Sequence, residues 1–371
     1  MSHLFFWSQG NRPFASNAQP GQLTVGTVNE NWTGDARYYE YTTAADPIGS
    51  GIISPIPAKE FNPELYNSGE TRIVTIDLSV ELRTEYPVTS PSLLTNFIRI
   101  TSGDSINTNP NATSELNYII SGTGTTLVNG ETINWKKGDF MTLPSGSVSR
   151  HTASEDATIY YILDTPLLDY LGVEAKKFRF EPTLFTAEEA QAKLDEVANA
   201  PDAHLKNRIS ILLNNQKFDQ TLTITHVLWA MFGIVPVGSN QAPHSHKSVA
   251  LDFVAYAAPG TYTLVGDKVD PETSEIIDPI RIDWVPGKAF VTPPGLWHSH
   301  HNESGELAFI IHSGRGPSDI PSYFGYSIHS LRPGLMRVAK FCERNIRVPG
   351  KTLLPHPIND CRSKRCGRFS K

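Results

Sequence analysis

Two histidine-bearing segments in the C-terminal half have the residue types and the spacing of a metal site. His244 and His246 are separated by one residue, and His298 follows about fifty residues later. Side chains two positions apart on a β-strand point to the same face. Three neutral imidazoles that converge inside a curled sheet would hold a divalent metal. Imidazole suits Fe, Zn, Cu and Ni alike, so these residues alone do not choose the metal.

The residues around these histidines repeat a recognisable pattern. The first segment reads Gly238-x5-His244-x-His246, and the second reads Gly287-x5-Pro293-x-Gly295-x2-His298-x3-Asn302. This pair is similar to the two motifs of the cupin family. The resemblance implies small β-barrels in which the three histidines lie together.

The N-terminal half repeats the same spacing with different residues at the ligand positions. Asn109 and Asn111 replace the paired histidines, Ser149 replaces the third, and Glu115 remains. Amides and a hydroxyl are weak ligands for a transition metal. We therefore expect this half to supply structure and interface, with the metal chemistry confined to the second half.

The repeat, with a period of roughly 140 residues, predicts an all-β bicupin: two double-stranded β-helix (jelly-roll) barrels joined by a helical linker. Asn129-Gly130 predicts a hairpin, Thr186 with Glu189 predicts the start of a helix that ends near Pro201, and 222–229 is predicted as a strand. The expected divisions are an N-terminal arm (1–70), a first barrel (71–170), a helical linker (171–215), a second barrel (216–325) and a C-terminal extension (326–371).

Further residues make the resemblance more specific. They are His-x-His-x3-Ala-Leu-x-Phe at 244–253, Thr-Pro-Pro-x2-Trp-His-x-His at 292–300, and Trp229-Ala230, fifteen residues before His244. Together they look like gentisate 1,2-dioxygenase and its salicylate and hydroxynaphthoate relatives. This implies Fe(II), with Zn, Mn, Ni or Cu as alternatives, bound by His244, His246 and His298. It also implies O2-dependent cleavage of an aromatic ring substrate of the hydroxy- or aminobenzoate kind, and a homo-oligomer.

Three residues are candidates for the substrate pocket. His300 shares a face with His298, so we expect it to act in catalysis and to contact substrate as a hydrogen-bond donor. Trp229 is expected to line the pocket. Asp252 stands where the resembled family has an arginine that holds the substrate carboxylate, and it is expected to face the pocket with His246.

Composition limits the classes of partner. The chain has 371 residues and a formal net charge of -6, without a basic stripe, so nucleic acid is not an expected partner. The apolar run near the N-terminus is four residues long, too short for a signal peptide or a membrane span. With only three cysteines, all in the last thirty residues, we expect no disulfide framework and a cytoplasmic location.

Two other functions fit the same residues. Zinc bound by three histidines and water would serve a hydrolase or an isomerase. A bicupin without catalysis could bind a small ligand, since the first half has already lost its metal ligands.

Overall fold

The computed structural model describes residues 32–144, 146 and 148–315, and contacts divide the chain into two units between Ile52 and Ile53. In the first unit the described part contains one short helix, α1 (Tyr41–Ala45), whose N-cap Glu40 accepts from the backbone N–H groups of Thr42 and Thr43. The predicted C-terminal extension and all three cysteines lie outside the described residues. Among the described residues, no helix is long and apolar enough to cross a membrane.

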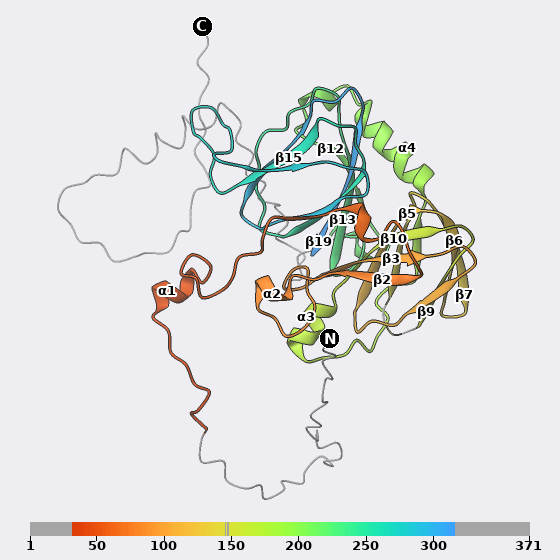
Figure 1. Cartoon of the computed structure of the whole chain (residues 1–371), viewed down its shortest axis with the longest axis horizontal. Helices are drawn as coiled ribbons and strands as arrows, with labels where there is room; N and C mark the ends of the chain where they lie inside the picture. The colour runs from red at the N-terminus through yellow and green to blue at the C-terminus, as the bar shows by residue number, and fades with distance from the viewer. Residues whose placement is uncertain (1–31, 145, 147, 316–371) are drawn as a thin grey trace, which may run out of the picture. The chain divides into compact units, whose positions relative to one another are not determined.

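The first barrel comprises one large and one smaller antiparallel sheet (Figure 1, orange to olive). Its strands are β2 (Arg72–Ile76), β3 (Leu94–Ile100), β4 (Ser105–Thr108), β5 (Ser114–Ser121), β6 (Thr123–Val128), β7 (Glu131–Lys136), β8 (Phe140–Pro144), β9 (Ser149–Ala153), β10 (Ala157–Leu163) and β11 (Thr183–Phe185). The six-stranded sheet has the order β11-β8-β5-β10-β3-β2, and the four-stranded sheet has the order β4-β9-β6-β7.

The second barrel repeats this plan (Figure 1, green to blue, apart from the orange β1). Its strands are β1 (Lys59–Phe61), β12 (Ile209–Leu213), β13 (Leu228–Val235), β14 (Ala250–Tyr256), β15 (Thr261–Gly266), β16 (Ile280–Asp283), β17 (Ala289–Thr292), β18 (Trp297–Asn302) and β19 (Ala308–Arg315). The six-stranded sheet has the order β1-β17-β14-β19-β13-β12, and β16-β15-β18 form the smaller one. The predicted all-β class with two barrels is confirmed.

Short helices lie outside the sheets: α2 (Ser79–Leu82), α3 (Thr165–Leu171) and α4 (Ala187–Ala198), with single 3-10 turns at Pro63–Leu65, Ala203–Leu205 and Gln216–Phe218. Helix α4 confirms the predicted linker helix, and Thr186 Oγ1 accepts from the backbone N–H of Glu189 at 3.3 Å. The predicted hairpin is also confirmed. Asn129 and Gly130 both have positive φ, as the tight turn between β6 and β7 requires.

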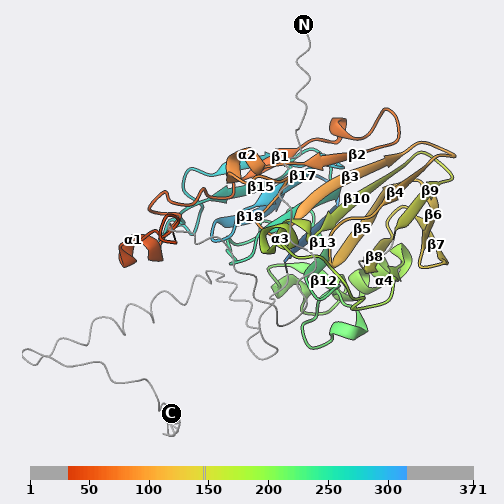
Figure 2. The same cartoon turned by 90° about the horizontal axis from the view of Figure 1, so that it is seen from below.

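Strand pairing draws residues from the predicted arm and linker into the barrels. Strand β1, from the arm, pairs with β17, and β12, from the linker, pairs with β13, so both complete the large sheet of the second barrel (Figure 2). Strand β11, also from the linker, pairs with β8 of the first barrel. The domain boundaries themselves stay a prediction.

The strand predicted at 222–229 is wrong for most of its length, because β13 begins only at Leu228. Leu222 has a left-handed backbone, with φ 52°. The hydroxyl of Thr225 accepts from the backbone N–H groups of Val227 and Leu228, at 3.2 and 2.9 Å. Threonine side chains that take up local N–H groups in this way favour turns over strands.

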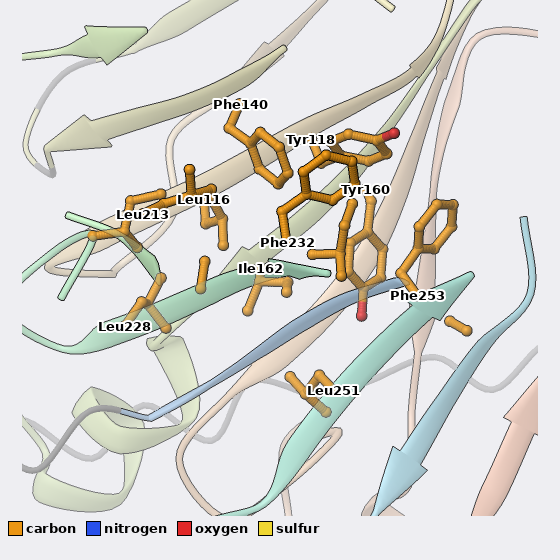
Figure 3. Packing of buried hydrophobic residues seen from close by; sticks show 14 of the residues in the cluster. Leu116, Tyr118, Phe140, Tyr160, Ile162, Leu213, Leu228, Phe232, Leu251 and Phe253 are labelled. Atoms are coloured by element: carbon orange, nitrogen blue, oxygen red, sulfur yellow. The ribbon is translucent and has the colours of Figure 1, made fainter. Parts of the chain in front are cut away.

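A hydrophobic core joins the large sheets of the two barrels (Figure 3). Phe253 of β14 packs on Tyr160 of β10, with ring centroids 4.9 Å apart. Leu251 and Phe253 belong to this shared core, whereas Val254 belongs to the core inside the second barrel. Since successive residues of a strand face opposite sides, Asp252 faces the barrel interior together with Val254. The shared core therefore fixes which side chains of β14 reach the interior.

Candidate functional site

The sheet brings the predicted metal-binding histidines together. Backbone hydrogen bonds run both ways between His244 and His298, with N···O distances of 3.0 and 2.8 Å, so the loop that carries His244 lies directly beside β18. The ring centroid of His298 is 4.1 Å from that of His244 and 4.7 Å from that of His246. Two imidazoles bound to one ion at ~2.1 Å have ring centres about 5 Å apart, so both distances are of the right order.

Each of these three rings is oriented by a backbone carbonyl two residues away. The pairs are His244 Nδ1 with Ala242 O at 3.2 Å, His246 Nδ1 with Ser248 O at 2.6 Å, and His298 Nδ1 with Leu296 O at 3.3 Å. A carbonyl can only accept, so Nδ1 carries the ring hydrogen and Nε2 keeps its lone pair. The Nε2 atom of His244 is buried and has no hydrogen-bond partner among the residues that the structure describes. An orphaned acceptor of this kind is what a metal ion would satisfy.

The electrostatic setting favours neutral imidazoles. Burial lowers the pKa of His244 to about 2, and the nearby charges of Arg208 and His300 act in the same direction. Burial also holds the pKa of His298 well below its usual value and lowers that of His246. Neutral rings at neutral pH are the form that binds a metal.

In donor type, tautomer and charge, the three histidines fit a divalent ion. Within the described ranges, however, no three His, Cys, Asp or Glu side chains already stand around a common point as metal ligands do. The convergence of all three Nε2 atoms on one ion therefore stays a prediction, as does the identity of the metal.

His300 lies beside this cluster and is held by a short hydrogen-bonded chain. The indole N–H of Trp284 donates to Thr263 Oγ1 at 2.8 Å, and Thr263 Oγ1 is 2.8 Å from Nδ1 of His300. The ring centroid of His300 is 5.9 Å from that of His298. Its Nε2 is buried and has no hydrogen-bond partner. The ring is thus fixed at Nδ1 and unpaired at Nε2 among the described residues, and its predicted role in catalysis and substrate contact stays a prediction.

Asp252 does lie in the barrel interior, but its oxygens are engaged. Thr292 donates its hydroxyl to Oδ2, and Nδ1 of His312 contacts Oδ1, both at 2.5 Å. The predicted direct contact between Asp252 and substrate stays untested. His312 was missed in the sequence, although its signal was present. A buried carboxylate needs a partner, and His312 lies opposite Asp252 in the β14–β19 register.

Arg208 is the second residue that the sequence did not single out. It immediately precedes β12, and its guanidinium lies close enough to the cluster to lower the pKa of His244, His246, His298 and His300. Burial lowers the pKa of Arg208 itself, which the charge of Asp252 partly opposes. An isolated arginine before a strand is no signal in a single sequence. Only folding shows that its charge acts on the histidines.

Trp229 is buried on β13, opposite Gly314 of β19 in the register. A Cβ on Gly314 would come within 2.8 Å of the Trp229 Nε1 atom, so the glycine leaves room for the indole. Within the described ranges the indole N–H has no hydrogen-bond partner. Trp229 faces the same side as Val235, inside the second barrel, and its predicted contact with substrate stays a prediction.

The equivalent positions of the first barrel are arranged differently. Asn109 is exposed, and the amide of Asn111 is bound to the backbone of Val173 and Ala175. Ser149 Oγ is buried without a partner. Glu115 accepts from the hydroxyl of Tyr161 at 2.5 Å.

Comparisons with known proteins agree with this architecture. Salicylate 1,2-dioxygenase from Pseudoaminobacter salicylatoxidans, solved as a mutant in complex with gentisate, superimposes with a TM-score of 0.56 and 13% identity, over 74% of this chain and 86% of that chain. A second structure of this dioxygenase, with gentisate adducts, gives a TM-score of 0.57 and 13% identity over 74% and 85%. The chain has a bicupin fold.

A comparison of sequences matches a much shorter segment of the chain. This bicupin is 38% identical to 5-aminosalicylate 1,2-dioxygenase of Comamonas sp over 61 residues, which is 16% of this chain and 16% of the relative. No protein-family model matches the chain. The fold expected from the resemblance to the gentisate dioxygenases is thereby confirmed, and a segment of the bicupin is similar to a ring-cleaving dioxygenase.

Proposed function

We propose that this bicupin is an iron-dependent dioxygenase that opens the ring of an aromatic acid with a hydroxyl or amino group beside its carboxylate. The observation that carries the proposal is the orphaned Nε2 of buried His244, beside rings of His246 and His298 whose Nδ1 atoms are held by backbone carbonyls. Support comes from the fold shared with salicylate 1,2-dioxygenase and the segment shared with 5-aminosalicylate 1,2-dioxygenase.

The residues of the second barrel have distinct roles in this proposal. His244, His246 and His298 would hold Fe(II), which when bound supplies the redox chemistry that O2 cleavage needs. His300 donates a hydrogen bond from Nε2 to the bound reactants when Thr263 donates its hydroxyl proton to Nδ1, because a neutral imidazole carries one ring hydrogen.

Arg208 would bind the substrate carboxylate. No hydrogen bond or ion pair joins its guanidinium to another described residue, and the side chain is half-buried. A partly buried cation is stabilised by a partner, and a planar carboxylate matches the guanidinium. Arg208 would thus supply the positive charge for an acidic substrate that Asp252, at the position of the arginine in the resembled family, does not supply.

To test this proposal, the protein is first reconstituted with Fe(II) under nitrogen. O2 uptake is then measured after air-saturated buffer and substrate are added. The substrates are salicylate, gentisate and 5-aminosalicylate, each paired with the matching phenol that lacks the carboxylate. We expect uptake with at least one acid, a product heavier by two oxygen atoms, and little uptake with its phenol. Zinc retained by the protein, with no uptake for any compound, would instead point to a hydrolase or isomerase.

The variant Arg208→Gln tests the carboxylate site. Removing one half of a buried charge-assisted pair costs about 2–3 kcal/mol, so KM for the acid should rise roughly 50-fold. Lys206→Gln is the matched control, because Lys206 is an exposed neighbour paired with Asp202. An unchanged KM in Arg208→Gln would remove Arg208 from the binding site.

A further inference from the structure

The interior of the second barrel contains a buried pair of ionisable side chains, Asp252 and His312. Their closest atoms, Oδ1 and Nδ1, are 2.5 Å apart, and the side chains are 1% and 7% exposed. The other carboxylate oxygen accepts from Thr292. Nothing in the proposed iron site requires this pair, yet burying two ionisable groups costs free energy unless each is well satisfied.

The pair leaves one nitrogen of His312 available. Because the carboxylate takes Nδ1–H, the neutral ring has its lone pair on Nε2. Nε2 makes no hydrogen bond to a described residue. The ring lies on the interior side of β19 with its centroid 5.2 Å from that of His300, which in turn adjoins His298. A base oriented by a carboxylate thus stands next to the cluster.

We propose that His312 is the proton acceptor of this pocket and that Asp252 is its positioning residue. The proposal rests on the proposed function, since it needs a substrate with a ring hydroxyl. As the substrate binds, its O–H bond breaks, the electron pair stays on the oxygen, and the proton forms a bond with Nε2 of His312. The resulting imidazolium is stabilised by the carboxylate of Asp252, as in other Asp–His pairs.

The charges of the neighbouring groups agree with this assignment. Arg208 would supply the cation for the carboxylate of the substrate, and the negative charge on the ring oxygen is stabilised further by a positive group in addition to the metal ion. A protonated His312 provides one without adding net charge, because the proton moves only from substrate to ring. His300 is held differently, because its Nδ1 is occupied by Thr263 and no carboxylate of the described residues forms a hydrogen bond with it.

The test measures the number of protons released to the buffer when the substrate binds. Salicylate binding to Fe(II)-loaded protein is followed by calorimetry under nitrogen in two buffers with different heats of ionisation. The wild type should release close to no proton to the buffer. His312→Asn, whose amide can still donate to Asp252, should release about one proton per bound salicylate. Equal release by both proteins would overturn the proposal, whereas absence of binding to the wild type would overturn the proposed function with it.

Steady-state rates provide a second readout. In His312→Asn we expect kcat to fall about 100-fold with KM nearly unchanged, which a general loss of structure would not produce. If His312→Asn does not fold, Asp252→Asn replaces it as the test variant, because it retains the contact with Thr292. Asp252→Asn should lower kcat less than His312→Asn. His301→Asn is the control, because His301 stacks on Tyr262 on the other face of β18. If His312→Asn and Asp252→Asn both have the kcat of the control, His312 is not the proton acceptor.

Discussion

In both barrels an indole, a threonine and a histidine are joined in the same order. Trp135 donates to Thr126, which contacts Nδ1 of His151, with distances of 2.9 and 2.8 Å. Trp284, Thr263 and His300 repeat this in the second barrel at 2.8 and 2.8 Å. The histidines occupy equivalent positions, two residues after Ser149 and His298 respectively. This series of hydrogen bonds is therefore a feature of the repeated fold, and its presence alone does not indicate catalysis.

The two barrels differ in the surroundings of the Nε2 atom of this histidine. Nε2 of His151 is 3.2 Å from the hydroxyl of Thr108, so the first barrel closes its chain. Nε2 of His300 has no partner in the described part of the chain, and the ring lies beside that of His298. Burial lowers the pKa of His151 to about 4 and holds that of His300 well below its usual value, so both rings are neutral. The two barrels therefore differ at Nε2 of this histidine, which is paired with Thr108 in the first barrel and has no partner among the described residues in the second.

The largest expected effect is on the iron content, which should depend on the histidines of the second barrel and not on the equivalent residues of the first. His244→Ala should lose nearly all bound iron and all substrate-dependent O2 uptake, because an orphaned ligand is removed. Ser149→Ala changes the equivalent of His298 in the first barrel and should leave both unchanged. Metal analysis of proteins purified without chelators provides the measurement. Full iron retention in His244→Ala would contradict the site.

The next effect concerns Glu115, whose counterpart in the second barrel is Ala250. Burial raises the pKa of Glu115 from 4.5 to about 7, although the Tyr161 hydroxyl opposes the shift. The folded protein therefore holds this proton more tightly than the unfolded chain does. Its contribution to stability is full below pH 4.5 and is lost as the pH rises through about 7.

Glu115→Gln should remove this pH dependence. Relative to the wild type, the variant should gain roughly 3 kcal/mol of unfolding free energy between the acid and the neutral side of this window. Urea unfolding across the window measures the change. Glu131→Gln, at an exposed position of β7, is the control and should follow the wild type. Parallel curves for the wild type and Glu115→Gln would show that Glu115 is ionised in the fold.

The smallest effect tests the shared hydrogen-bonded chain. Thr126→Val and Thr263→Val each leave a buried indole N–H and a ring nitrogen unpaired, so each should lower the unfolding free energy by about 1–3 kcal/mol. Only Thr263→Val should also lower kcat, by roughly 10-fold, because His300 loses its fixed tautomer. Denaturation and O2 uptake are measured on both. A similar fall in kcat for Thr126→Val would mean that the barrels are coupled.

Local patterns in the sequence determined much of this protein. Asn129-Gly130 specified its hairpin, Thr186 specified the start of α4, and the spacing of His244, His246 and His298 was enough to predict that they lie together. Each of these depends on backbone geometry over a few residues or on the two-residue period of a strand. The strand predicted at 222–229 failed because Thr225 takes up backbone N–H groups, a local competition that residue composition does not show.

Tertiary structure alone decided the electrostatics of the site. Arg208 and His312 are separated from the histidine motifs along the chain and reach them only because β12 and β19 join the same sheet. The oxygens of Asp252 are engaged by partners on two other strands, a fact that no spacing encodes. Long-range pairing and burial set these charges, and both are properties of the closed barrel rather than of any segment.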